Sequence, residues 1–211
     1  MSAYKLYCRG ESGNCYKVAL MLNLVGADWE AEFVDFFNPD SKAAFIHTVN
    51  PQGELPVLQR PDGKLLTQSG AILDYLSRAT GRFAPASDED RQEVLRWLLF
   101  DNHRFTPAFA TLRFMVGIRG AEENQLTGYL RAQAQAAYEI VDAHLAGRRF
   151  MVGDAPTVAD ISMAGYLYYD EDARFDRLQF ANVQAWAGRI SELPRWKHPY
   201  ELMPRAIREG N

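Results

Sequence analysis

The chain has 211 residues, which is enough for one large domain or two modest ones. Hydrophobic residues make up 47% of the sequence and charged residues 24%, as in an ordinary globular protein, so an intrinsically disordered chain is excluded. The formal net charge of -4, without a clustered basic excess, argues against nucleic acid or an anionic membrane surface as a partner.

The first third of the chain alternates between extended and helical patterns. Four runs are predicted to be strands: residues 4–8, 31–36, 57–60 and 64–66. Three helices are predicted between or after them: one that ends at Gly26, one over residues 42–47, and one that runs from Ser69 to Gly81. The predicted order of elements is therefore β-α-β-α-β-β-α.

A linker separates two predicted domains. Residues 81–86 carry Gly81 and Pro85 and show neither helical nor strand periodicity. The alternating pattern before the linker predicts an α/β domain over residues 1–80. The helical pattern after it predicts an all-α domain over residues 87–211.

Everything after the linker is predicted to be helical. Ser87 to Asp90 resembles a capping box that opens a long helix, and Pro107 is expected to kink that helix. Three further helices are predicted: one over residues 130–145 and two that begin near Thr157 and Asn182. Thr157 to Asp160 also fits a capping box, which indicates a structural role for this segment.

Signals for export, membrane insertion and metal binding are weak. The N-terminal residues form no apolar stretch of secretory type, and no run approaches the roughly 18 apolar residues of a membrane span, so we expect a cytoplasmic protein. The two cysteines, Cys8 and Cys15, are too few for a disulfide scaffold. The four histidines show no ligand spacing with one another or with cysteine, and we expect no metal.

The loop after the first strand contains the frame Ser12-Gly13-Asn14-Cys15. In redox proteins with this β-α order, a Cys-x-x-Cys pair lies here, where a helix N-terminus favours a thiolate. Ser12 replaces the nucleophilic cysteine. Its hydroxyl can donate a hydrogen bond to a ligand thiolate, and with the helix end it supplies about 2 to 4 kcal/mol, enough to lower a thiol pKa by about two units. The alternative is that Ser12 only caps the helix.

Pro56 precedes the third predicted strand, in the stretch "NPQGELPVL". Proline cannot donate to a sheet ladder, so it belongs at an edge, at a first residue or at a cis bond. A cis Pro56 would leave the backbone N–H and C=O of Leu55 unpaired by any neighbouring strand, and an extended peptide could pair with them. The alternative is an ordinary strand start with a trans bond.

Four segments together resemble the cytosolic glutathione S-transferases over the whole chain: "SGNCYKV", "NPQGELPVL", "TQSGAILDYL" and "GDAPTVADIS". Each segment is a weak signal alone, but their order and spacing are specific. The resemblance is to bacterial, serine-type members with a theta- or delta-like loop. It implies a thioredoxin-like N-terminal domain, an all-helical C-terminal domain, glutathione as co-substrate and a homodimer.

The resemblance also implies roles for the residues of the first domain. The cysteinyl part of glutathione would pair with the backbone at Leu55, beside Pro56, while Ser12 holds the thiolate and Asn14 assists as a donor. The "SGNCYKV" segment matches the serine-type classes without a gap, which favours Ser12 as the catalytic residue. Some classes use a tyrosine of the first strand instead, and Tyr7 is the alternative here.

Relatives bind the γ-glutamyl end of glutathione with an acidic residue and a serine before the third helix. Gln68 and Ser69 stand at this position. Gln68 can accept and donate hydrogen bonds, but an amide pairs less strongly than a carboxylate with an ammonium group. Ser69 can cap its helix and present N–H groups to a carboxylate, or it can act as a cap alone.

The second substrate would lie between the domains, against the long helix with Pro107. Its apolar wall is predicted to include these residues: Phe105, Phe109, Leu112, Phe114, Tyr166 and Tyr169. The alternative is that these side chains belong to the core, as aromatic residues at helical spacing commonly do. Asp101 falls where some relatives contact glutathione from the partner subunit.

The sequence therefore predicts a glutathione transferase with a detoxification role, which adds the glutathione sulfur to a hydrophobic electrophile. A glutathione-dependent peroxidase or disulfide reductase at the same site is one alternative, because some relatives use a cysteine in the loop that holds Cys15. Cys15 itself is expected to be an inert core thiol. A binding or interaction module without turnover is the other alternative. Pocket-lining residues vary in identity, so the electrophile is not predicted.

Overall fold

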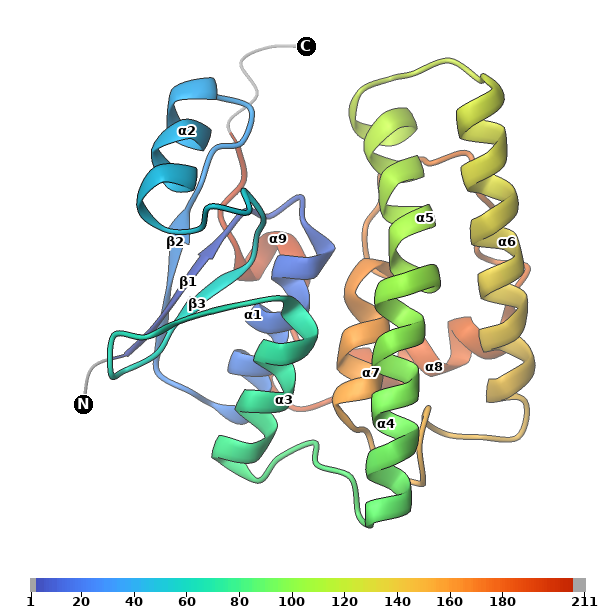
Figure 1. Ribbon diagram of the computed structural model, residues 1–211. Helices are drawn as coiled ribbons and strands as arrows, with labels where there is room; N and C mark the ends of the chain where they lie inside the picture. The colour runs from blue at the N-terminus through green and yellow to red at the C-terminus, as the bar shows by residue number, and fades with distance from the viewer. Residues whose placement is uncertain (1–2, 207–211) are drawn as a thin grey trace. The chain divides into compact units, whose positions relative to one another are not determined.

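The computed structural model describes residues 3–206, which divide into two units (Figure 1). The helical unit is Phe83–Leu193, and the chain before and after it forms the α/β unit. The predicted domain bounds also cover residues 1–2 and 207–211, which lie outside the described residues. The structure differs from those bounds after Leu193, where the tail joins the α/β unit and not the helical one.

The tail is held on the α/β unit by hydrogen bonds to the first helix and to the loop before that helix. The Tyr16 hydroxyl donates to the Lys197 carbonyl at 2.8 Å, and the Asn23 amide donates to the Arg195 carbonyl. The backbone N–H of Gly10 donates to the Pro204 carbonyl at 2.7 Å. These contacts join residues far apart in the sequence, so no local pattern predicts them.

The α/β unit has the predicted order β-α-β-α-β-β-α, followed by one short helix of the tail. Its elements are β1 (Tyr4–Cys8), α1 (Gly13–Val25), β2 (Trp29–Phe33), α2 (Pro39–Thr48), β3 (Val57–Gln59), β4 (Leu65–Thr67), α3 (Ser69–Thr80) and α9 (Pro199–Leu202). The thioredoxin-like fold class of this half is thereby confirmed.

The sheet of this unit has the strand order β2-β1-β3-β4. β1 is parallel to β2 and antiparallel to β3, and β3 and β4 form the predicted hairpin. Successive side chains of a strand point to opposite faces. Leu6 and Cys8 are fully buried on one face of β1, whereas Tyr7 on the other face packs against Phe45 of α2. The sheet therefore holds apolar side chains on both faces.

The helix α1 is defined by its two ends. Ser12 caps the N-terminus, and Gly26 ends the helix in a left-handed conformation with φ of 70°. Nearly all residues of α1 are buried, so this helix lies inside the unit. It lies beside α3 and also contacts α9 (Figure 1). Packing along the whole helix consequently holds the N-terminal end of α1 in place.

The helical unit contains helices only, among the residues that the structure describes. They are α4 (Asp88–Phe100), the π-helical η1 (Asp101–Phe105), α5 (Thr106–Leu112), the π-helical η2 (Arg113–Ile118), α6 (Gln125–Leu145), α7 (Val158–Met163), the 3₁₀ turn η3 (Ala164–Tyr166) and α8 (Ala181–Ser191). The all-helical prediction for this half is confirmed.

The long helix passes Pro107 by changing its hydrogen-bond pattern. A proline inside an α-helix removes one N–H donor and clashes with the preceding turn. Here the π-helical η1 directly precedes α5, and Pro107 is the second residue of α5. The segment around Pro107 therefore continues from α4 to η2 as one helix with two π-helical parts.

Two N-terminal caps agree with the sequence patterns. Ser87 accepts a hydrogen bond from the Asp90 N–H at 3.0 Å, which is the forward half of the predicted capping box. Thr157 and Asp160 form both halves of theirs. Asp160 is fully buried and also accepts from the Met151 N–H at 2.8 Å and from the Trp186 indole at 2.9 Å. This carboxylate therefore links α7 to α8 and to the segment before α7.

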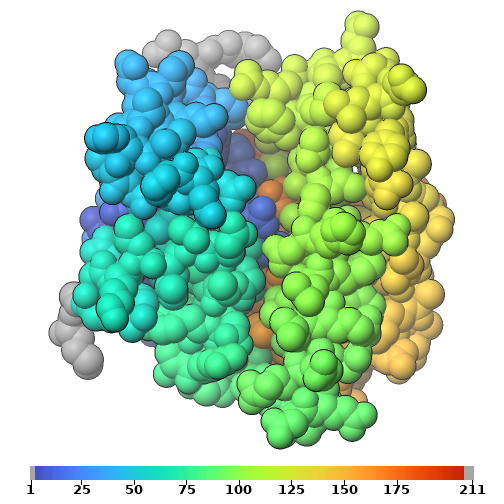
Figure 2. Space-filling model, in the orientation of Figure 1, coloured from blue at the N-terminus to red at the C-terminus, as the bar shows by residue number. Residues whose placement is uncertain are grey.

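The helix α4 presents apolar side chains to solvent. Leu95 and Leu99 are 52% and 62% exposed. They stand four residues apart and so share one face of the helix. Figure 2 shows the segment of α4, in green, at the surface of the helical unit. These two leucines form a small apolar patch on α4.

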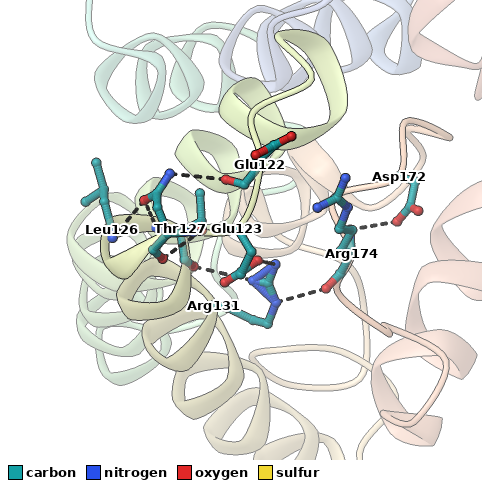
Figure 3. A network of polar contacts seen from close by, with 8 residues as sticks. Glu122, Glu123, Leu126, Thr127, Arg131, Asp172 and Arg174 are labelled. Atoms are coloured by element: carbon teal, nitrogen blue, oxygen red, sulfur yellow. Dashed lines mark hydrogen bonds and ion pairs between the residues drawn. The ribbon is translucent and has the colours of Figure 1, made fainter.

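A polar network fixes the start of α6 (Figure 3). Asn124 caps the helix in a reciprocal capping box with Thr127. Arg131 forms an ion pair with Glu123 at 2.8 Å and donates to the Arg174 carbonyl at 3.0 Å. These groups are mostly exposed, so each contributes modestly, but together they tie α6 to the loop before α8.

Residues 3–206 contain neither a candidate membrane span nor a candidate metal cluster. No helix in this range is both long enough and apolar enough to cross a membrane. No group of three or more His, Cys, Asp or Glu side chains in the same range could hold a metal ion.

Candidate functional site

Ser12 lies at the N-terminus of α1, between β1 and the helix. Its backbone is extended, and its Oγ accepts a hydrogen bond from the Cys15 N–H at 3.3 Å. The capping role is therefore present. Capping uses a lone pair of the oxygen, so it does not itself consume the hydroxyl hydrogen. The cap and the predicted thiolate donor are compatible roles for the same side chain.

The first turn of α1 is suited to a negative charge. It contains no acidic residue, so no side chain of the turn itself compensates the positive end of the helix dipole. Asn14 lies in this turn, and among residues 3–206 its buried Oδ1 has no hydrogen-bond partner. This oxygen is an acceptor, so a donor role of Asn14 towards a thiolate would have to use its Nδ2 amide group. The structure thus places Ser12 and Asn14 at the same helix end.

The peptide bond between Leu55 and Pro56 is cis, as one of the two sequence interpretations required. Pro56 is buried directly before β3. In the part of the chain that the structure describes, no backbone hydrogen bond of Leu55 is found. The Leu55 side chain packs against the cluster of Val34, Phe45 and Val57. The backbone of Leu55 therefore remains able to pair with an extended peptide.

The start of α3 differs from the prediction in one detail. Ser69 was expected to cap the helix, but Gln68 is the N-cap residue and no side chain bonds to the first turn. Ser69 is the first residue of the helix and is buried. Gln68 has a φ of 66°, which is rare for a residue with a side chain. The cap residue therefore lies one position earlier than expected.

Gln68 contacts a residue that the sequence did not single out. Its Nε2 donates to Glu54 Oε2 at 2.9 Å. Glu54 lies two residues before Pro56, and the hairpin of β3 and β4 brings it to the start of α3. Sequence spacing contains no sign of this pair, because it depends on the register of the hairpin.

The alternative catalytic residues, Tyr7 and the cysteines, have other surroundings. The Tyr7 hydroxyl donates to Gln59 Oε1 at 3.4 Å, and its ring packs against Phe45. Burial raises the pKa of Cys15 to about 11, although a hydrogen bond with Ser12 partly opposes the shift. Burial likewise raises the pKa of Cys8. Both thiols are therefore protonated near neutral pH, as expected for inert core cysteines.

Three of the predicted second-substrate residues lie in the interior of the helical unit. Phe105, Phe109 and Leu112 are all buried. The rings of Phe105 and Phe109 pack against Tyr138, with centroid distances of 4.6 and 5.9 Å. This burial favours the alternative that these side chains belong to the core. A role beside the second substrate stays a prediction.

Two other residues of the predicted wall, Tyr166 and Tyr169, lie beside a buried arginine. The Arg113 guanidinium lies 3.9 Å from the ring centroid of Tyr169 and 6.0 Å from that of Tyr166. Arg113 also forms an ion pair with Glu171 at 2.8 Å. Phe114, by contrast, is exposed. Tyr166 is half-buried and retains some accessible surface.

The expectation for Asp101 is wrong. Its side chain has no exposed surface, so it cannot contact a partner subunit. Its two carboxylate oxygens accept hydrogen bonds from the hydroxyls of Thr106 and Ser162, both at 2.6 Å. A carboxylate can be buried when hydrogen bonds replace its water contacts. Asp101 is therefore a structural link between η1 and α7.

The loop before Ser12 contains a buried ion pair that the sequence analysis missed. Arg9 Nε lies 3.2 Å from Glu11 Oε2, and the Arg9 guanidinium stacks on Phe37 at 4.0 Å. The other Glu11 oxygen accepts from the Ala206 N–H at 3.3 Å. With the bond from Gly10 to the Pro204 carbonyl, the tail fixes the loop that carries Ser12.

Gly10→Ala tests this contact. A Cβ at Gly10 would lie 3.0 Å from the Pro204 carbonyl oxygen and 2.9 Å from Arg205 Cγ, so the tail has to move. We expect the free energy of unfolding to fall by about 1 to 3 kcal/mol, as for other overpacked sites, in urea denaturation. Gly188→Ala is the control, because its Cβ meets no atom within 4 Å. Equal stability of the two variants would contradict the prediction.

Comparison with known proteins identifies related sequences. The family model described as "Glutathione S-transferase, N-terminal domain" matches residues 11–79, and the model described as "Glutathione S-transferase, C-terminal domain" matches residues 105–194. A maleylacetoacetate isomerase of Rhizobium meliloti is 33% identical over 171 residues, which cover 77% of this chain and 79% of that protein.

Solved structures resemble the chain over nearly its whole length. A glutathione S-transferase of Pseudomonas fluorescens is 33% identical, with a TM-score of 0.86 over 94% of this chain and 99% of that one. A glutathione transferase of Pseudomonas putida is 26% identical, with a TM-score of 0.79 over 92% of this chain and 88% of that one. The latter structure contains one glutathione disulfide per protein subunit.

Proposed function

Because this chain belongs to the cytosolic glutathione S-transferase family, we propose that it binds reduced glutathione and conjugates it to an electrophilic, hydrophobic small molecule. The observation that carries the proposal is the position of Ser12. Its oxygen caps α1, and its hydroxyl lies at the N-terminus of a helix whose first turn contains no acidic residue. We also propose that the protein acts in the cytoplasm, as its sequence suggests.

In the proposed reaction, the glutathione thiol first loses its proton to solvent. The thiolate accepts a hydrogen bond from the Ser12 hydroxyl and is stabilised by the N-terminus of α1. The sulfur then forms a bond to carbon of the electrophile, and the bond from that carbon to the leaving group breaks. Ser12 forms no covalent bond; it contributes an oriented dipole that needs no rearrangement during the reaction.

The remainder of the tripeptide would be held by backbone groups. We propose that the cysteinyl residue pairs with the backbone of Leu55, next to Pro56, and that Asn14 donates to the ligand near the sulfur. The γ-glutamyl carboxylate would accept hydrogen bonds from the first turn of α3, at Ser69. Gln68 would contact the same end of the ligand. The lack of backbone partners at Leu55 and the uncapped first turn of α3 support this arrangement.

A panel of substrates tests the proposal. With glutathione present, we expect turnover of halonitroaromatic or epoxide substrates and retention of the protein on a glutathione column. Absence of both turnover and retention would support a binding or interaction module with no catalytic activity. Turnover confined to hydroperoxides or mixed disulfides would replace the transferase with a peroxidase or reductase.

The disulfide reductase is the second candidate function, since the Pseudomonas putida neighbour contains glutathione disulfide. A route through Cys15 is disfavoured, because its thiol is buried and its pKa is raised to about 11. A reductase at this site would therefore have to use the sulfur of glutathione itself.

The raised pKa of Cys15 predicts that the free energy of unfolding depends on pH. The folded pKa of about 11 exceeds the roughly 8.5 of a free cysteine. The stabilisation is therefore complete below about pH 8.5 and is lost as the pH rises towards 11, by about 3 kcal/mol in total. The difference in unfolding free energy between the wild type and Cys15→Ala should shrink across this range. Parallel pH profiles of the two proteins would contradict the assignment.

We further propose a homodimer that uses the apolar patch on α4. Exposed leucines on one helix face are typical of an interface. The double variant Leu95→Glu with Leu99→Glu should shift the protein from dimer to monomer in light scattering after size-exclusion chromatography. Leu178→Glu is the control, because Leu178 is 79% exposed in the loop before α8. A dimer that persists in the double variant would exclude this face of α4 as the dimer interface.

A further inference from the structure

The pair of Glu54 and Gln68 presents a negative charge at the start of α3. The hydrogen bond between them uses the Gln68 amide nitrogen and one Glu54 oxygen. Within residues 3–206, Gln68 Oε1 and Glu54 Oε1 make no hydrogen bond, so two acceptors remain on the pair. Both side chains are exposed and can be reached by a ligand. The pair therefore combines a full carboxylate charge with an amide acceptor.

The backbone on both sides of this pair is held in place. Asn50 is buried, and its amide donates to the Glu54 carbonyl at 2.9 Å and accepts from the Gln52 N–H at 3.2 Å. Gln68 has a φ of 66° between β4 and α3, and its carbonyl accepts from the Ile72 N–H at 3.0 Å. The backbones of Glu54 and Gln68 are thus held without a ligand, which lowers the entropy that binding would cost.

The position of the pair suits an α-amino acid. Ser69 begins α3, whose first turn offers N–H groups to a carboxylate. In an α-amino acid the carboxylate and the ammonium group share one carbon atom. When the carboxylate of an α-amino acid binds at the first turn of α3, the ammonium group of the same amino acid is therefore brought towards the adjacent Gln68. Glu54, which is hydrogen-bonded to Gln68, lies at the same place.

We propose that Glu54 binds the ammonium group of the γ-glutamyl end of the ligand, and that Gln68 positions Glu54 for this contact. The inference rests on the proposed function, since it assigns the charge recognition at the same glutathione site. Glu54 supplies the negative charge that the amide of Gln68 lacks. The site then selects peptides whose N-terminal end carries both a carboxylate and a free ammonium group.

Calorimetric titration with two ligands tests this role. Glutathione is compared with glutaryl-cysteinylglycine, which has the same shape but no ammonium group. We expect the wild type to bind glutathione about 10- to 100-fold more tightly, as for one charge-assisted hydrogen bond, and Glu54→Gln to lose this preference. Glu122→Gln, which removes an exposed carboxylate of the helical unit, is the matched control and should keep the preference.

A double variant that exchanges the two side chains distinguishes the loss of the Glu54 contact from the loss of a negative charge at the site. The double variant Glu54→Gln with Gln68→Glu keeps one carboxylate and one amide in the pair, so it should recover the preference for glutathione. If the wild type binds glutathione and Glu54→Gln keeps the full preference, the role of Glu54 is contradicted while the proposed function stands. If the wild type binds neither ligand, the proposed function fails, and this inference fails with it.

Discussion

Ser12→Ala is expected to lower kcat/KM for glutathione conjugation by about 3- to 25-fold at pH 7, because a rise of about one to two units in the pKa of the bound thiol lowers the thiolate fraction by that factor. The variant lacks the hydroxyl that would donate to the thiolate, whereas the helix end stays in place. Steady-state rates with a halonitroaromatic substrate at saturating glutathione measure the effect. The loss should be smaller at high pH, where more of the thiol ionises without assistance.

Two further measurements separate catalysis from folding. Ser12 also caps α1 through the bond from the Cys15 N–H, so alanine should reduce stability by about 1 kcal/mol. Ser12→Thr keeps the hydroxyl and should retain most of the activity and of the cap. If the alanine variant folds with that small loss and conjugates at the wild-type rate, Ser12 is a cap alone. Tyr7→Phe would then be the next variant to assay.

Asp160→Ala is expected to have the largest effect on stability, a loss of about 3 to 5 kcal/mol, which approaches the whole stability of many domains. The carboxylate is fully buried and accepts hydrogen bonds from the N–H groups of Met151 and Thr157. It also accepts from the Thr157 hydroxyl and the Trp186 indole. Alanine would leave these donors buried without an acceptor. Urea denaturation followed by far-ultraviolet circular dichroism measures the loss.

The control for Asp160 lies in the same segment. Asp154 is exposed, and Asp154→Ala should change the free energy of unfolding by less than about 0.5 kcal/mol. Asp160→Asn keeps the shape and one acceptor oxygen, so it should fall between the alanine variant and the wild type. An alanine variant as stable as Asp154→Ala would show that the network contributes little.

The local parts of the structure could be predicted from the sequence. Strand and helix order follows from short-range periodicity, and the caps at Ser12, Ser87 and Thr157 follow from residues within one helical turn. Pro56 restricted the start of β3 to a few backbone states, of which the cis form is present. These features depend on a few adjacent residues, so the sequence contains their causes.

Features that depend on distant partners could not be predicted. Asp101 has the polar side chain of a surface residue, but Thr106 and Ser162 allow it to be buried. The contact between Glu54 and Gln68 depends on hairpin register. The tail joins the α/β unit through backbone carbonyls, which every residue possesses, so no residue type indicates the contact. Tertiary packing decides each of these cases.

The central claim is that Ser12 and the N-terminus of α1 keep the sulfur of bound glutathione ionised. The most direct test is an ultraviolet titration of the thiolate absorbance of glutathione in complex with the wild-type protein and with Ser12→Ala. We predict a thiol pKa of about 6.5 in the wild-type complex, roughly two units below that of a free thiol, and a rise of about one to two units in Ser12→Ala. A bound thiol that titrates near 8.5 in the wild type, or at the same pH in both proteins, would contradict the claim.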